Sequence, residues 1–118
     1  MVRSTIRMYI SPKKLSEALE ILGSSIEQTQ FEPGCISCRL YRDAQEEGLV
    51  MLEELWMNDE DLQHHLRSEK YRKILLAIEM GSKKPEIRFE TIAQSSGVET
   101  IEKARTKTVT RLSIHLII

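Results

Sequence analysis

Apolar side chains recur at two spacings along this 118-residue chain, one typical of strands and one typical of helices. Residues 2–10 alternate between apolar and polar positions, which predicts a strand with one more apolar face. From Ser11-Pro12 onward, apolar positions fall three and four residues apart, as in a helix of about 16 to 19 residues with a Ser cap and an early Pro. These helix positions are Leu15, Ala18, Leu19, Leu22 and Ile26.

The middle of the chain predicts a hairpin. A turn signal at Phe31-Glu32-Pro33-Gly34 precedes an alternating segment over residues 36–41. A polar loop ending in Gly48 follows, and residues 49–56 are again typical of a strand. We therefore expect the two segments to pair as neighbouring antiparallel strands.

A second helical region follows the hairpin. Asn58 can cap a helix whose first turn is acidic, and Ser68 marks a restart of the same apolar stripe, which continues to Gly81. Residues 85–92 alternate and predict a fourth strand, and residues 98–105 predict a short helix.

The order β-α-β-β-α-β predicts an α+β, ferredoxin-like fold with a four-stranded antiparallel sheet and both helices on one face. We expect Val, Ile and Leu side chains on the helix-free face, which a second copy would bury in a homodimer. The chain then divides into a domain over 1–105 and a C-terminal extension over 106–118. Because apolar positions alternate in that extension, we expect it to pair as an edge strand or to exchange with the partner.

Charge and composition exclude several classes of partner. With 17 Lys and Arg against 18 Asp and Glu, the net charge is −1, which leaves no basic surplus for nucleic acid. No apolar run approaches the roughly 20 residues of a membrane span, and no signal-peptide core follows Met1. The sequence therefore predicts a cytoplasmic protein without membrane or nucleic-acid partners.

Two adjacent histidines differ in the face that they occupy. At about 100° per residue, His65 lies near Leu62 and Leu66, whereas His64 lies on the opposite side of the helix. Only His65 can face the sheet. It is either a general base or an imidazole at the edge of the core that donates one hydrogen bond.

Trp56 and two glutamates close the third strand. Trp56 either lines a pocket for a planar ligand or packs in the core with its indole N–H satisfied at the sheet edge. Glu53 and Glu54 are adjacent, so they point to opposite faces, which argues against a paired-carboxylate site. We expect one of them beside Arg39 or Arg7 as an ion pair of the sheet.

Cys35 and Cys38 have C-x-x-C spacing where a strand begins. Residues three apart on a regular strand point to opposite faces, so the two sulfur atoms should diverge unless the strand starts after Cys35. The sequence contains no second C-x-x-C and no zinc-ligand spacing of histidines. We therefore expect reduced cysteines, no metal and no cofactor.

Several short segments together resemble the antibiotic biosynthesis monooxygenase domain family, from the first strand to about Arg105. They are Glu32-Pro33-Gly34-Cys35, Tyr41-Arg42-Asp43, Glu54-Leu55-Trp56, Asn58, His65-Leu66, Tyr71 and a closing Gly97-x-Glu99-x-Ile101-Glu102-x-Ala104-Arg105. The resemblance implies a dimeric α/β barrel with a small hydrophobic cavity between sheet and helices. It also implies an oxygenase that uses molecular oxygen without metal or flavin on small aromatic, quinol-type substrates.

Carried onto this sequence, the resemblance makes His65 the catalytic base and places Trp56 at the border of the pocket. Leu62, Leu66 and Tyr71 complete the expected contacts with a small hydrophobic aromatic substrate. Two alternatives remain open. One is a non-catalytic, small-molecule-binding dimer. The other is a haem-degrading monooxygenase, although such relatives are expected to carry an Asn that the first strand here lacks.

Overall fold

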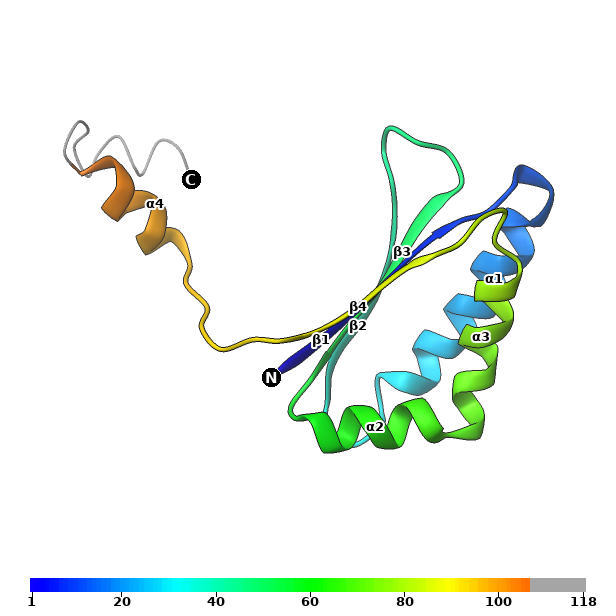
Figure 1. Ribbon diagram of the computed structural model, residues 1–118, viewed down its shortest axis with the longest axis horizontal. Coiled ribbons are helices and arrows are strands. Elements are labelled where there is room, and N and C mark those ends of the chain that lie inside the picture. Colours follow the sequence, from blue (N-terminus) through cyan, green and yellow to red (C-terminus); the bar gives the residue numbers. More distant parts are fainter. Residues whose placement is uncertain (107–118) are drawn as a thin grey trace.

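A four-stranded antiparallel sheet with helices on one face forms the body of the protein (Figure 1). The computed structural model describes residues 1–106. The elements are β1 (Val2–Tyr9), α1 (Pro12–Thr29), β2 (Cys35–Arg42), β3 (Leu49–Trp56), α2 (Asp59–Arg67), a 3₁₀ turn (Glu69–Tyr71), α3 (Arg72–Glu79), β4 (Glu86–Thr91) and α4 (Val98–Arg105). The strand order β2-β3-β1-β4 confirms the expected ferredoxin-like fold.

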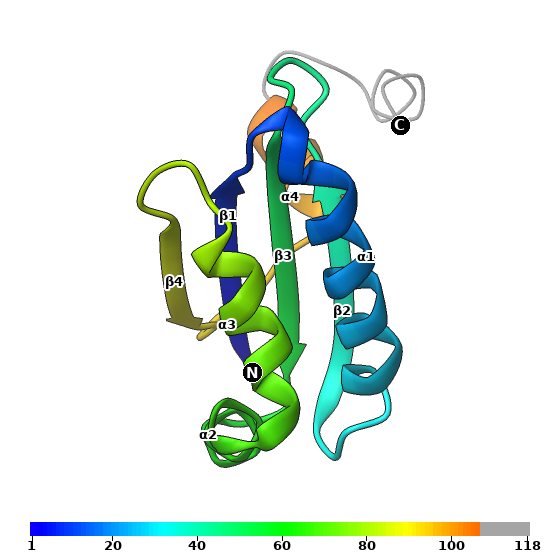
Figure 2. The same cartoon turned by 90° about the vertical axis from the view of Figure 1, so that its right-hand side faces the viewer.

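The helices cover only part of the sheet. Figure 2 shows α1 and α3 in front of β1, β2 and β3, with β4 at the open edge. Every second residue of β1 is buried beneath them, and so is every second residue at the end of β3, because strand side chains alternate between faces. The core contains Ile6, Met8, Leu22, Leu52 and Ile74 among others. All six residues of β4 are exposed.

The predicted N-cap residues of two helices can be compared with the structure. Asn58 caps α2 as expected, since its side chain accepts a hydrogen bond from the Asp61 amide at 2.9 Å. Ser11 occupies the N-cap position of α1 as expected, but its side chain makes no capping hydrogen bond. Pro12 is the first residue of α1, also as expected, because its missing N–H costs nothing there.

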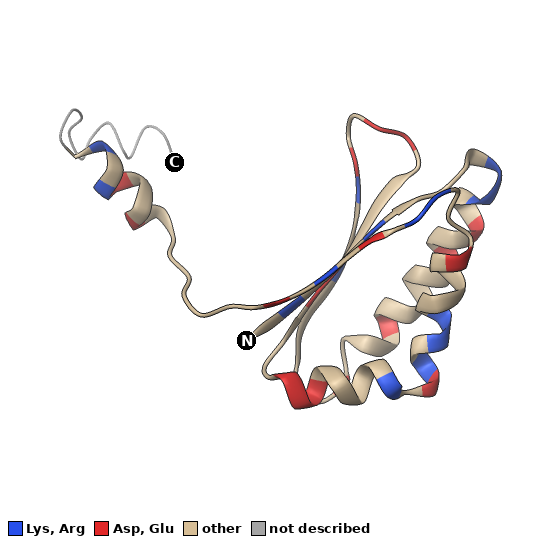
Figure 3. Cartoon of the chain, in the orientation of Figure 1, with Lys and Arg blue, Asp and Glu red and all other residues tan. Residues whose placement is uncertain are grey.

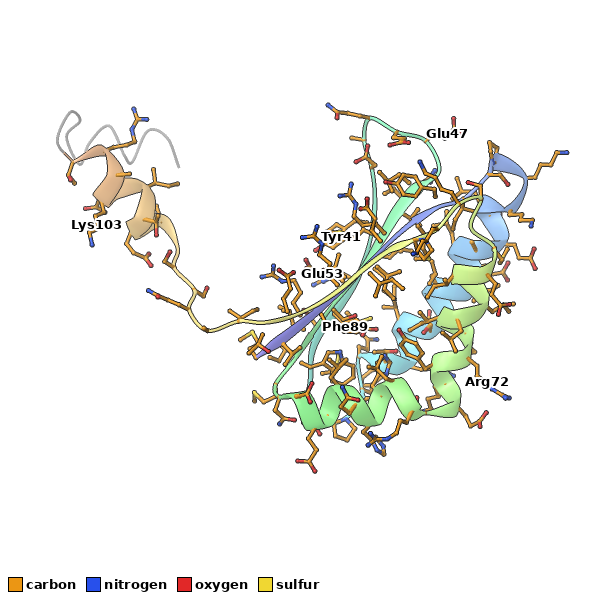
Figure 4. The ribbon with its side chains drawn as sticks, viewed as in Figure 1. Tyr41, Glu47, Glu53, Arg72, Phe89 and Lys103 are labelled. Atoms are coloured by element: carbon orange, nitrogen blue, oxygen red, sulfur yellow. The ribbon has the colours of Figure 1, made fainter. Side chains whose placement is uncertain are left out.

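The predicted homodimer depends on apolar side chains on the helix-free face, and that expectation about the face is wrong. The face carries a mixture of charged, aromatic and apolar side chains in place of the expected Val, Ile and Leu. Arg39 lies opposite Glu53, and Thr5 lies between Glu53 and Arg88. In Figure 4, Tyr41 and Glu53 lie on the side of the sheet away from the helices. The Val, Ile and Leu residues of the strands lie mainly on the helix-covered face, because the helices need that apolar surface.

α4 confirms the short helix predicted over 98–105, and none of its residues is buried. Figure 1 shows it apart from α1 and α3, on the other side of the sheet. The predicted edge or exchanged strand lies in residues 107–118, outside the described residues, and so does nearly all of the proposed extension over 106–118. Within residues 1–106, no helix combines the length and apolar character that crossing a membrane requires.

Candidate active site

α2 places His65 against the sheet. The helix buries Leu62 and His65 on one side and leaves His64 exposed on the other, as the helical spacing predicts. His65 is only 1% exposed. α2 begins after its Asn58 cap and runs for nine residues, so His65 lies in its last turn. There it lies directly over the end of β3.

The end of β3 provides the sheet side of the site. Glu54 and Trp56 share the helix-covered face, and both are almost completely buried. The Trp56 indole N–H donates to a Glu54 carboxylate oxygen at 3.1 Å, and the Cys38 thiol lies 3.9 Å from the other oxygen. The indole is therefore satisfied inside the core, and the expectation that it would find its partner at the sheet edge is wrong.

The loop between α1 and β2 provides a third group, Glu32. Its amide bonds back to the Thr29 carbonyl at 3.0 Å, and its carbonyl accepts from the Cys35 amide at 3.1 Å, which closes a tight turn. Gly34 occupies this turn with φ +83°, and its carbonyl accepts from the Met57 amide at 2.8 Å. A side chain at Gly34 would collide with Asp61, so the turn and the start of α2 are closely fitted.

These three segments meet at the His65 ring. Its Nδ1 lies 2.9 and 3.1 Å from the two Glu32 oxygens, and its Nε2 lies 3.2 Å from a Glu54 oxygen. Ionised carboxylates only accept hydrogen bonds, so this geometry suits an imidazolium, in which both ring nitrogens donate. Burial alone would lower the pKa of His65, but the hydrogen bonds and charges of Glu54 and Glu32 outweigh it, and the pKa is raised.

Aromatic rings enclose this Glu32–His65–Glu54 array. The Trp56 ring centroid lies 4.6 Å from that of His65, and Tyr71 meets His65 edge-on at 5.1 Å. Burial, followed by the Glu54 charge, raises the pKa of Tyr71 to about 12. The Tyr71 hydroxyl therefore stays protonated near neutral pH.

The two cysteines correct the parity argument. β2 does begin at Cys35, but the register with β3 shifts between Cys35 and Ser37. Cys35 consequently opposes Trp56 while Cys38 opposes Glu54, so the bulge brings both cysteines to the helix-covered face. Burial and then the Glu54 charge raise the pKa of Cys35 to about 11 and raise that of Cys38 further. Both stay thiols, which are poor nucleophiles.

The structure brings the five predicted site residues together. His65, Trp56, Leu62 and Tyr71 are buried side by side, and Leu66 packs partly buried against them. Five surface hollows within residues 1–106, of about 180 to 460 Å³, are lined by other residues. Within the same residues, no group of three or more His, Cys, Asp or Glu side chains is arranged to hold a metal ion.

Sequence reasoning missed both carboxylates. The expectation of a sheet ion pair with Arg39 or Arg7 is wrong for the buried glutamate, because Glu54 pairs with His65. Its strand parity with Leu52 and Trp56 was the available signal, since it predicts an acid on the buried face. Glu32 is 33 residues from His65 in sequence, and only its place in the Glu-Pro-Gly segment singled it out.

Comparison with protein-family models identifies the family of this protein. The model of the antibiotic biosynthesis monooxygenase family matches residues 1–75, which include the whole Glu32–His65–Glu54 array. This match covers more than half of the chain. The protein therefore belongs to the antibiotic biosynthesis monooxygenase family.

Several solved structures share this fold. A crystal structure of an antibiotic biosynthesis monooxygenase superposes with a TM-score of 0.72 at 20% identity, covering 80% of this chain and all of that one. Rv0793 from Mycobacterium tuberculosis gives 0.73 at 23% identity, covering 81% and 98% of the two chains. A conserved protein from Methanosarcina mazei Go1 gives 0.71 at 28% identity, covering 75% and 89%.

A curated relative is longer than the matching region. The uncharacterized protein sll1783 of Synechocystis sp. is 28% identical over 87 residues, which are 73% of this chain. The matched residues span 59% of the length of that protein.

Proposed function

We propose that the protein is a cofactor-independent monooxygenase of small aromatic, quinol-type substrates. The observation that carries the proposal is the buried Glu32–His65–Glu54 array, enclosed by Trp56 and Tyr71, in a member of this family. A paired acid and imidazole in a water-poor, aromatic environment suits the removal of a phenolic proton.

The chemistry requires only the substrate and oxygen. A hydroquinone that loses its phenolic proton becomes electron-rich enough to reduce O₂. One oxygen atom forms a bond to a ring carbon, the other leaves as water, and the ring ends as a hydroxyquinone. The O–O bond and one ring C–H bond break: both phenolic protons end in the water, the hydrogen of the attacked carbon ends on the new hydroxyl group, and the hydroquinone supplies all four electrons. The protein has to provide a base, orientation and exclusion of bulk water.

The register of the sheet suggests where a ring would approach. One row on the helix-covered face runs through Cys38, Glu54, Ser4 and Phe89, from β2 to β4. Phe89 is 48% exposed at the open end of this row, and only the small side chain of Ser4 separates it from Glu54. In Figure 4, Phe89 lies on the helix side of the sheet. A ring stacked on Phe89 would have its hydroxyl directed toward Glu54.

In this arrangement the Glu54–His65 pair acts as the base. His65 holds a proton on each nitrogen, so Glu54 receives the phenolic proton and the imidazolium stabilises the phenolate that remains. Trp56, Leu62, Leu66 and Tyr71 provide the walls that exclude water from this charge.

Oxygen uptake with a panel of hydroquinones tests the proposal. We expect turnover that persists in EDTA and needs no added flavin. His65→Ala should lower the rate about a hundredfold or more, and His64→Ala, the matched control on the exposed side of α2, should leave it nearly unchanged. Equal small effects of the two substitutions would contradict a catalytic role for His65.

A non-catalytic, small-molecule-binding protein is the second candidate. It is favoured by the occupation of both His65 nitrogens, which leaves no free lone pair on the ring. Trp56 is the sole tryptophan of the chain, so its fluorescence reports on this site alone. Quenching by a hydroquinone under nitrogen, without oxygen uptake in air, would select this candidate. An unchanged haem Soret band in a titration with haemin would exclude haem degradation.

We also propose that the protein acts as a homodimer. The helix-free face supports this through complementary rows of arginines and glutamates that a second copy could match, with apolar contacts from residues such as Met51 and Leu55. Figure 3 shows basic and acidic residues interleaved along the strands. Light scattering should give about twice the chain mass of 13.7 kDa. A monomer at micromolar concentration would contradict the dimer.

A further inference from the structure

Glu32 is the member of the array that differs most from the other two in solvent access. Its side chain is 11% exposed, whereas those of His65 and Glu54 are 1% and 2% exposed. Both of its oxygens lie within 3.1 Å of Nδ1, which is closer than Glu54 comes to Nε2. Glu32 therefore makes the closer contact with the ring while standing nearest to solvent.

The backbone holds Glu32 where it is. The turn that carries it is fastened to the end of α1 through Thr29 and to the start of α2 through the Gly34–Met57 hydrogen bond. α2 also carries His65, so the carboxylate and the ring are attached to segments that touch at Gly34 and Asp61. A surface glutamate on a free loop would have no such fixed relation to the ring.

We propose that Glu32 is a positioning residue for His65: it holds Nδ1 and keeps the ring doubly protonated, so that Nε2 always presents an N–H to Glu54. An imidazole without Glu32 could rotate, or lose the Nδ1 proton and become neutral, with Glu54 as its remaining hydrogen-bond partner. Glu32 would act through His65, without touching the substrate. This role rests on the proposed function for its effect on catalysis, but its effect on the ring can be measured separately.

Other charged and titratable groups face the same ring. They are Cys35 and Cys38 on β2, Glu54 on β3 and Tyr71 in the 3₁₀ turn. The two thiols and the tyrosine stay neutral near pH 7, because their pKa values are raised to about 11 or higher. Glu32 and Glu54 are therefore the two groups that can set the charge of His65.

Nuclear magnetic resonance of the full chain with ¹⁵N-labelled histidine tests the proposal. In the unchanged protein we expect the His65 ring to stay doubly protonated above its ordinary pKa. Glu32→Gln keeps a hydrogen-bond acceptor but removes the charge, so the ring should titrate at lower pH. Glu27→Gln, an exposed acid on α1, is the matched control and should leave the titration unchanged. Glu32→Asp should restore part of the shift.

An unchanged His65 titration in folded Glu32→Gln would overturn the proposal. If Glu32→Gln does not fold, the titration of Glu32→Ser, which also removes the charge, decides in its place, and a titration identical to that of the unchanged protein overturns the proposal. In the oxygen assay, Glu32→Gln should lower kcat about tenfold or more and shift its pH profile, with little change in KM. Absence of oxygen uptake in every variant would contradict the proposed function and leave the ring titration to decide the role of Glu32.

Discussion

The two faces of the sheet differ in the burial of their charged side chains, although the same strands form both faces. On the helix-covered face, Glu54 is buried, and it is held by His65, Trp56 and Cys38. On the helix-free face its neighbour Glu53 is half-buried and lies opposite Arg39 in the register. One step along β3 therefore leads from a half-buried acid in contact with solvent to an acid in a buried array.

The difference shows which groups stabilise a charged side chain in each environment. Arg7 and Glu86 on the helix-free face approach only to 3.7 Å, with side chains 45% and 57% exposed, and water stabilises each of them. A charge under the helices loses that water and must find its partners within the protein. The helix-covered face therefore binds its acids tightly, whereas the helix-free face can present charge to a partner. Paired substitutions on neighbouring residues can test this comparison.

The largest expected effect comes from Trp56. Trp56→Ala removes a fully buried ring and the donor to Glu54, and should lower the free energy of unfolding by about 4 kcal/mol. Leu55→Ala, one residue away on the helix-free face, should cost clearly less because Leu55 is only half-buried. Urea unfolding measures both, and equal losses would contradict the comparison.

A smaller effect is expected from removing one buried charge. Glu54→Gln leaves the His65 imidazolium with one counter-charge fewer and should cost about 3 kcal/mol. The same change at Glu53 should stay within about 0.5 kcal/mol, because that side chain keeps its contact with water. If Glu54→Gln costs little stability, His65 is neutral in the folded protein. The nuclear magnetic resonance spectrum of ¹⁵N-labelled histidine tests this directly.

The pH dependence of stability gives the next contrast. The folded protein binds the His65 proton more tightly than the unfolded chain, whose histidine titrates near 6.5. The resulting stabilisation is complete below that value and is lost as the pH rises through the raised pKa. Thermal or urea unfolding should thus show stability falling above pH 6.5. His65→Gln should abolish this slope and His64→Gln should retain it; the reverse result would place the buried proton elsewhere.

The smallest effect is expected on the helix-free face. Glu86→Gln breaks the exposed pair with Arg7 and should change the free energy of unfolding by less than about 0.5 kcal/mol. Added salt should shrink even that difference, because salt screens exposed charges. A loss of several kcal/mol in a monomeric sample would show that this face, like the opposite one, depends on its charges.

Local patterns in the sequence were sufficient for the architecture. The period-two and helical spacings predict every strand, the restart at Ser68 and the burial of His65 in place of His64, because these depend on the directions of side chains within one element. The Asn58 cap is equally local. The same reasoning failed at Cys35, since a bulge reverses the parity of a strand and leaves no mark in the spacing of its side chains.

Only the tertiary structure decided which polar groups meet. Glu32, Glu54 and His65 belong to a loop, a strand and a helix, and nothing in their spacing relates them. They converge because the turn at Gly34 holds the end of α1 against the start of α2, while β3 carries Glu54 beneath both. The sequence by itself determined the order of elements and, outside the bulge at Cys35, the alternation of faces along each strand and helix, since both follow from backbone geometry over a few residues. The contacts of His65 with two acids arise only when the helices close over the sheet and exclude the water that would otherwise solvate each group separately.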